Sequence, residues 1–256
     1  MSVTASVQDR VGWITLDRPP ANSYDPAFID ELDDAVGTVA TAGVAVAVVR
    51  SASPKFFSAG ADVKGFLRRS AEDNLAMVRR AHQVLDRFAA EAPVFVAAIA
   101  GHALGGGYEI ALACDLRIAA EGGYRIGLPE VTLGLLPGTG GTQRLPRLIG
   151  RGRALELMTS GRTVTPDEAH RLGMVDRLVP AEELDHAVAE LAATLAAGAP
   201  LAVAAVKRSV VDGVDRPLAD GLRHELEQLA PLFASDDARE GMTAFIDKRP
   251  ASYGGR

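Results

Sequence analysis

The sequence is nearly free of cysteine, and it contains no long apolar run. Its single cysteine, Cys114, excludes an internal disulfide framework and a metal site built from clustered cysteines. The longest apolar runs, Val44–Val49 and Val94–Ala100, are far shorter than the ~18–20 residues that a membrane-spanning helix requires. Residues Met1–Arg10 lack the apolar segment of a secretory signal. We therefore expect a cytoplasmic protein with no membrane partner.

An excess of positive charge is also missing. The chain has 27 Lys and Arg residues against 33 Asp and Glu residues, a formal net charge of -6. Basic residues interleaved with aromatics, as in nucleic-acid-binding surfaces, are not found, and we expect no nucleic-acid partner. With 48% hydrophobic and 23% charged residues, the composition is that of a folded globular protein.

Strand-like and helical patterns alternate through the first part of the chain. Apolar, β-branched runs at Val11–Leu16, Val44–Arg50 and Val94–Ala100 predict strands. Two apolar stripes at helical spacing lie between them: Phe28, Leu32, Val36, Val39 and Val78, Ala81, Leu85, Phe88. This alternation predicts an α/β protein with a sheet covered by helices.

After about Thr163 the pattern becomes helical. Two further stripes follow: Leu184, Val188, Leu191, Leu195 and Leu222, Leu226, Leu229, Phe233. Pro231 falls inside the second stripe and is expected to kink or break that helix. Ser235 is a candidate N-cap for a last helix through Phe245 and Ile246. The helical region is either a separate domain or an arm that packs on a neighbour.

Two segments rich in small residues follow predicted strands. In the first, Phe56–Lys64, small side chains would let the backbone approach a ligand, although a plain loop has the same composition. In the second, Gly101–Glu109, three glycines precede a helical stretch, Tyr108–Ala113. Free N–H groups at such a helix start suit a phosphate or an oxyanion, and a tight turn is the alternative. Glu109 amid apolar neighbours is either salt-bridged or a tuned acid or base.

A third segment, Leu128–Leu145, contains a second acidic candidate. Pro129 at a first helical position would make Glu130 an ordinary acidic residue of a first turn. Alternatively, Glu130 pairs with Glu109. The spacing of the two residues in the sequence leaves this open.

Taken in order, these segments resemble the crotonase (enoyl-CoA hydratase/isomerase) superfamily. The resemblance is carried by five segments and covers nearly the whole chain: Phe57–Lys64, Gly101–Glu109, Cys114–Ala119, Pro129–Arg144 and Phe245–Pro250. It implies a spiral of repeated β-β-α units over residues 1–180 and a helical trimerisation region over residues 181–256. It also implies a homotrimer or a hexamer of paired trimers, an acyl-CoA thioester ligand, and neither a metal nor a separate cofactor.

The resemblance assigns catalytic roles to four residues. The backbone N–H groups of Ala61 and Gly106 would form an oxyanion hole for a thioester enolate. Glu109 and Glu130 fall where hydratases of the family carry their two carboxylates. Glu109 would deprotonate the water that attacks C3, and Glu130 would deliver the proton to C2 of a 2-enoyl-CoA.

The resemblance also suggests residues that bind the substrate or its CoA part. These expected binding residues are Ala59, Gly60, Asp62, Val63, Lys64, Tyr24, Gly138 and Lys248. Asp62 could instead cap a turn, and Lys248 could belong to a solvated helix end. Tyr24 stands where small or aliphatic residues are commoner, so it could alter the acyl-chain preference.

Two other functions stay open. A 3,2-enoyl-CoA isomerase would use mainly one glutamate to move a proton between C2 and C4. A non-catalytic acyl-CoA-binding subunit would need neither, and the intact glutamate pair argues against it.

Overall fold

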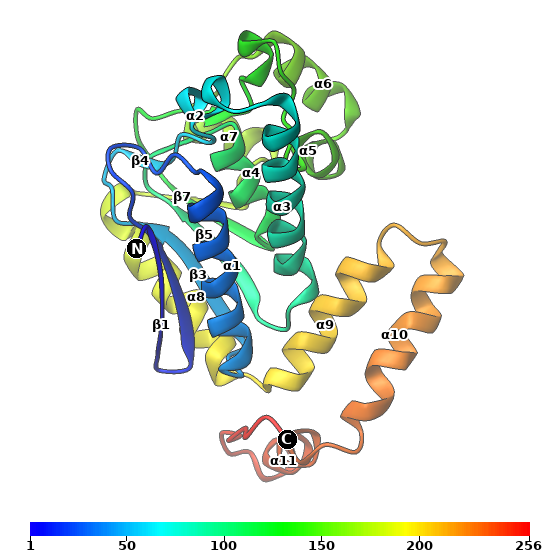
Figure 1. Cartoon of the computed structure of the whole chain (residues 1–256). Coiled ribbons are helices and arrows are strands. Elements are labelled where there is room, and N and C mark those ends of the chain that lie inside the picture. Colours follow the sequence, from blue (N-terminus) through cyan, green and yellow to red (C-terminus); the bar gives the residue numbers. More distant parts are fainter.

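The computed structural model describes all 256 residues and contains a six-stranded main sheet (Figure 1). The strand order is β1-β2-β3-β5-β7-β9, in which only the β1–β2 pair is antiparallel. The bounds are β1 Val3–Gln8, β2 Val11–Leu16, β3 Val46–Ser51, β5 Val94–Ile99, β7 Leu116–Ala120 and β9 Arg177–Val179. All three strands predicted from the sequence are confirmed, with β3 beginning two residues later than expected.

A second, three-stranded parallel sheet joins very short strands in the order β4-β6-β8. They are β4 Phe56–Ser58, β6 His102–Leu104 and β8 Ile126–Gly127, which the sequence patterns did not predict. Each follows a strand of the main sheet, so the chain repeats a long strand, a short strand and a helix. This is the expected spiral of β-β-α units.

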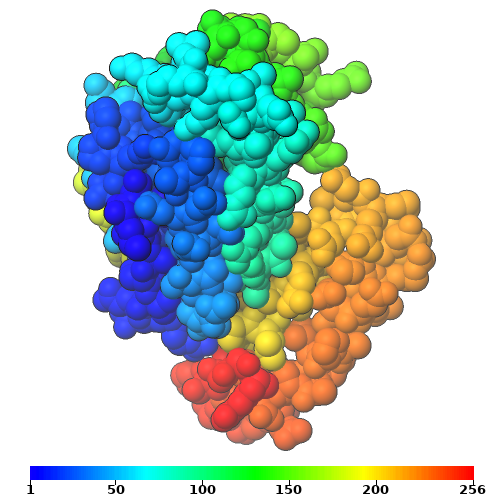
Figure 2. Space-filling view, viewed as in Figure 1, coloured from blue at the N-terminus to red at the C-terminus, as the bar shows by residue number.

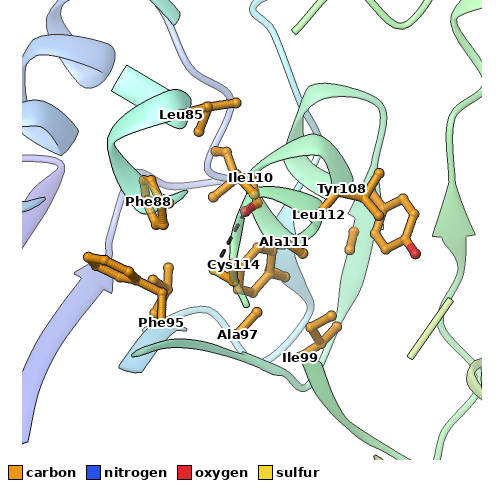
Figure 3. Close-up of a cluster of buried hydrophobic side chains, with 14 of the residues drawn as sticks. Leu85, Phe88, Phe95, Ala97, Ile99, Tyr108, Ile110, Ala111, Leu112 and Cys114 are labelled. Carbon is orange, nitrogen blue, oxygen red and sulfur yellow. Dashed lines mark hydrogen bonds between the residues drawn. The ribbon is translucent and has the colours of Figure 1, made fainter. Parts of the chain in front are cut away.

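Helices α1 (Pro26–Thr41), α3 (Ala71–Ala90) and α4 (Gly106–Ala113) share the larger hydrophobic core with one face of the main sheet. The stripe on α1 is buried as predicted, and Asp25 caps this helix by accepting a hydrogen bond from the Phe28 N–H at 3.0 Å. Helix α4 is buried at every residue. Figure 3 shows its apolar side chains packed against α3 and β5, which holds the start of α4 in place.

Helix α8 (Leu184–Ala197) covers the other face of the main sheet with Leu184, Val188, Ala192 and Ala196. The boundary expected between a spiral core and a helical region, at residues 180 and 181, falls shortly before α8. The first long helix after that boundary thus packs on the main sheet. The main sheet is buried on both faces, which explains the continuous apolar runs in β3 and β5.

The last helices are α9 (Pro200–Gly213), α10 (Leu218–Leu232) and α11 (Asp236–Asp247). Figures 1 and 2 show α10 standing away from the body of the molecule. Pro231 lies in the last turn of α10, so the expected break coincides with the helix end. Ser235 caps α11 as predicted, accepting a hydrogen bond from the Ala238 N–H at 3.0 Å.

The remaining elements are short helices. They are α2 Val63–Arg68, η1 Glu130–Leu133, α5 Gly141–Ile149, α6 Arg151–Ser160, α7 Pro166–Leu172 and η2 Ala181–Glu183. No single helix is long and apolar enough to cross a membrane. One pair, Ala181–Ala197 with Pro200–Gly213, meets the criterion jointly but is bent by 108°.

Candidate active site

The two segments of small residues lie directly against each other. A Cβ added to Gly60 would stand 2.9 Å from the Leu104 carbonyl oxygen and 3.0 Å from the Gly106 nitrogen. Gly60 also has a φ of 86°, which side-chain-bearing residues rarely adopt. Glycine at this position therefore permits the contact between the segment after β4 and the start of α4.

This contact leaves two backbone N–H groups without an acceptor. Tyr24 pairs with Ala61 in a parallel bridge, and its N–H and C=O bond to Gly60 and Asp62, both at 2.9 Å. The Ala61 N–H points away from that bridge and makes no hydrogen bond in the chain. The Gly106 N–H opens α4, where the helix itself offers no acceptor. Free donors of this kind can stabilise a developing oxyanion.

Glu109 lies in the first turn of α4 and is 1% exposed. Its Oε1 accepts hydrogen bonds from the Thr139 N–H at 2.8 Å and the Gly141 N–H at 2.7 Å, and its Oε2 pairs with the Thr139 hydroxyl. Burial raises the pKa of this carboxyl, while the donors from Thr139 and Gly141 oppose the increase. The donors orient the side chain and favour its ionised form.

Glu130 opens η1 and reaches the same place from a different β-β-α unit. A Cβ on Gly105 would lie 2.8 Å from its Oε1, so the carboxyl stands beside the glycine that precedes α4. Its Oε2 is buried without a hydrogen-bond partner. Burial, and then the charge of Glu109, raise the pKa of Glu130 to about 7. The structure thus brings the two glutamates together, which their sequence spacing alone left open.

The sequence suggested that Pro129 would be the first helical residue, but the structure differs. It occupies the N-cap position of η1, so Glu130 itself starts this short helix. The acidic side chain is nevertheless not an ordinary first-turn group, because it is half-buried, with one oxygen shielded from solvent, beside another carboxyl.

The expected binding residues do not all lie at the same place in the structure. Asp62 stands at the N-cap position of α2 without a capping hydrogen bond and pairs with Arg68 at 3.5 Å, so its alternative role as a helix cap is wrong. Val63 and Lys64 open α2 and are exposed. Ala59 donates its N–H to the Ala21 carbonyl oxygen at 2.9 Å.

Gly138 and Lys248 lie in different regions. Gly138 lies in the loop that precedes Thr139, and its carbonyl oxygen is 2.7 Å from Nε2 of His82 in α3. Lys248 follows α11, at the opposite end of the molecule from α2 (Figure 1). A single chain therefore does not bring Lys248 to the glutamates.

Thr139 and Gly141 were not assigned a role from the sequence. The glycine-rich run Gly138–Gly141 between Glu130 and α5 was the available signal, and only Gly138 was singled out. Two of the three donors to Glu109 are backbone N–H groups, which no residue type marks. No group of three or more His, Cys, Asp or Glu side chains is arranged to hold a metal ion.

A β-β-α spiral in which two free N–H groups lie beside two glutamates defines a protein of the crotonase fold. A family model for enoyl-CoA hydratase/isomerase matches residues 6–256. A probable enoyl-CoA hydratase of Mycobacterium leprae is 39% identical over 245 residues, covering 95% of this chain and 94% of the relative. The short-chain-enoyl-CoA hydratase of Clostridium acetobutylicum is 35% identical over 250 residues, covering 97% and 95%.

Solved structures agree with these sequence matches. An enoyl-CoA hydratase from Bacillus anthracis, 36% identical, matches with a TM-score of 0.96 and covers 100% of both chains. The chain therefore belongs to the enoyl-CoA hydratase/isomerase family of enzymes.

Proposed function

We propose that this chain is an enoyl-CoA hydratase, which adds water syn across a 2-trans-enoyl-CoA to give a 3-hydroxyacyl-CoA. The observation that carries the proposal is that Glu109, in the first turn of α4, and Glu130, beside the glycine that precedes α4, lie close enough for the charge of Glu109 to raise the pKa of Glu130. Two carboxyls suit a hydration, because one can accept a proton from water while the other donates one to carbon.

The two glutamates have different surroundings, which suggests different roles. Glu109 accepts hydrogen bonds from Thr139 and Gly141, which favour its carboxylate, so Glu109 is the base that deprotonates the attacking water. Glu130 has an unpartnered buried oxygen and a pKa of about 7, so Glu130 holds the proton that goes to C2. Neighbouring carboxyls with surroundings that differ in this way commonly divide acid and base roles.

The reaction proceeds at a thioester whose oxygen is bound by the N–H groups of Ala61 and Gly106. The water oxygen bonds to C3 as Glu109 takes a water proton, and the C2–C3 double-bond electrons move toward the thioester oxygen. The enolate then collapses as C2 takes the proton from Glu130. Proton exchange from Glu109 to Glu130 through solvent restores the starting state.

Hydration of crotonyl-CoA tests the proposal, followed as loss of the conjugated enoyl-thioester absorbance. Glu109→Gln and Glu130→Gln should each reduce kcat by about 10²–10⁴, while Glu121→Gln, an exposed control, should leave it unchanged. Loss of activity in only one glutamate variant, with turnover of a 3-enoyl-CoA, would favour an isomerase instead. Binding of CoA thioesters without any turnover would indicate a non-catalytic subunit.

We also propose that the chain forms a trimer or a pair of trimers through its last helices. The stripe predicted on α10 is exposed in the single chain: Leu222, Leu226, Leu229 and Phe233. An apolar face this long is commonly covered by another chain. Sedimentation equilibrium of the purified protein tests the assembly, and a monomer at micromolar concentration would contradict it. In such an assembly, Lys248 could reach a neighbouring subunit's CoA.

A further inference from the structure

Tyr24 is a buried tyrosine held between the two segments that carry the free N–H groups. Its backbone pairs with Ala61 in the parallel bridge, and its ring lies against Phe28 with 6.4 Å between ring centroids. The side chain is 4% exposed. The backbone bridge and the ring packing together restrict where the phenol can point.

The phenol points at Gly106. A Cβ added to Gly106 would lie 2.1 Å from the Tyr24 hydroxyl oxygen and 2.7 Å from Cζ. The hydroxyl therefore touches the residue that supplies one free N–H, while the Tyr24 backbone bridges to Ala61, which supplies the other. An oxygen atom bound by both N–H groups would lie next to this hydroxyl.

The Tyr24 hydroxyl also differs from the other buried tyrosine hydroxyls in its partners. The other two buried tyrosines donate to carbonyl oxygens: Tyr108 to Met174 at 2.9 Å, and Tyr124 to Ala120 at 2.6 Å. Tyr24 makes no such bond to a carbonyl oxygen, and its polar neighbour is the Thr139 hydroxyl, which donates to Glu109 and can still accept from Tyr24. A buried tyrosine hydroxyl whose one neighbour is another hydroxyl, and which stands beside two free N–H groups, can turn to a ligand oxygen.

The electrostatics keep this hydroxyl a donor. Burial, and then the charges of Glu109 and Glu130, raise the pKa of Tyr24 well above its ordinary value. The phenol is consequently neutral and protonated throughout the working pH range. A neutral donor is suited to an oxygen that gains negative charge in the transition state.

We propose that the Tyr24 hydroxyl donates a third hydrogen bond to the thioester oxygen of the acyl group, beside the N–H groups of Ala61 and Gly106. This inference rests on the proposed thioester chemistry, although not on hydration itself. The third bond strengthens as the thioester becomes an enolate, so it lowers the barrier to forming that enolate. Removing one such donor typically costs about 10²–10³-fold in kcat.

Tyr24→Phe tests the proposal because it removes the hydroxyl and keeps the ring. The matched control is Tyr124→Phe, which removes a buried hydroxyl bonded to Ile99 and Ala120. We expect Tyr24→Phe to reduce kcat for crotonyl-CoA by about 10²-fold with a smaller change in KM, since a bond formed mainly in the transition state is lost. Tyr124→Phe should lower the urea midpoint of unfolding and leave kcat unchanged.

Acetoacetyl-CoA provides a second readout that requires no hydration. This thioester ionises to an enolate with its own ultraviolet absorbance, and an oxyanion hole lowers the pH at which the bound molecule ionises. A 10²-fold loss of enolate stabilisation in Tyr24→Phe corresponds to an increase of about two pH units in that transition. The Tyr124→Phe protein should ionise the bound molecule at the wild-type pH.

Four outcomes are informative. Unchanged enolate formation in Tyr24→Phe overturns the proposal, even if hydration is slower, because the hydroxyl then acts elsewhere, for example through Thr139 on Glu109. A wild-type protein that does not bind acetoacetyl-CoA overturns it as well. A shifted enolate transition in a protein that hydrates no enoyl-CoA supports the third donor and refutes the hydratase function. Parallel changes in kcat and enolate formation support both.

Discussion

Replacing Glu130 by glutamine should stabilise the protein at alkaline pH while reducing its activity. The pKa of Glu130 is about 7 in the folded chain, against 4.5 as its ordinary value. The folded state therefore keeps a proton that the unfolded chain has already lost, and raising the pH from 4.5 to 7 favours unfolding. Above pH 7 the folded state carries an ionised carboxyl in a half-buried site.

The size of this effect follows from the shift in the pKa. A difference of roughly 2.5 units at 1.36 kcal/mol per unit gives a penalty of about 3 kcal/mol above pH 7. Glutamine has nearly the same shape and no charge, so the variant avoids the penalty. With a urea m-value of ~3 kcal/mol/M, the unfolding midpoint of the Glu130→Gln protein at pH 8 should lie at a urea concentration about 1 M higher than that of wild type. Near pH 4 the two proteins should unfold together.

Urea unfolding followed by circular dichroism, at one fixed protein concentration, measures this difference from pH 4 to pH 8. Glu121→Gln, an exposed substitution, controls for the loss of one negative charge from the chain. The reasoning is refuted if the Glu130→Gln and wild-type midpoints differ by the same amount at every pH. A stability gain that grows with pH, together with low kcat, would show that the acid is kept at a cost in stability.

Three other substitutions test different parts of the structure. Thr139→Val removes the hydroxyl donor to Glu109, so the pKa of Glu109 should rise further and kcat/KM should fall about tenfold at pH 6; an unchanged acidic limb of the pH profile would contradict this. Lys207→Met should lower the free energy of unfolding by about 3–5 kcal/mol and spare kcat, because the buried ammonium pairs with an aspartate and two carbonyl oxygens. Gly106→Ala should reduce kcat by at least about 10² because its Cβ would meet Tyr24, and wild-type kinetics would refute the contact.

The main sheet could be predicted from the sequence because its strands are long and buried on both faces. Apolar runs such as Val94–Ala100 are visible without any knowledge of the partners. The second sheet could not be predicted, since its strands have two or three residues and so show no alternation of side chains. The helical stripe on α10 predicted the helix correctly, yet its period does not reveal what, if anything, covers the stripe.

The candidate site was only partly predictable. The glycine run and Glu109 were visible as unusual residues at a strand-to-helix junction, but their pairing with Glu130 depends on how consecutive units of the spiral stack. That stacking is set by the parallel pairing of β4, β6 and β8. The surroundings of Glu109 were missed because backbone N–H groups hold it, and every non-proline residue carries such a group.

The three glycines at the start of α4, Gly105–Gly107, have different functions, although they look equivalent in the sequence. A Cβ on Gly107 would lie 2.2 Å from a carbonyl oxygen of β4, so glycine at this position lets the start of α4 approach β4. This approach brings together the two segments that carry the N–H groups of the proposed oxyanion hole. Gly106 accommodates the Tyr24 phenol, and Gly105 accommodates the Glu130 carboxyl. One tight backbone segment thus determines where the donors, the phenol and the acid stand relative to one another. A change in any of these contacts should displace a different group, which is why we expect separate kinetic effects from substitutions only one residue apart.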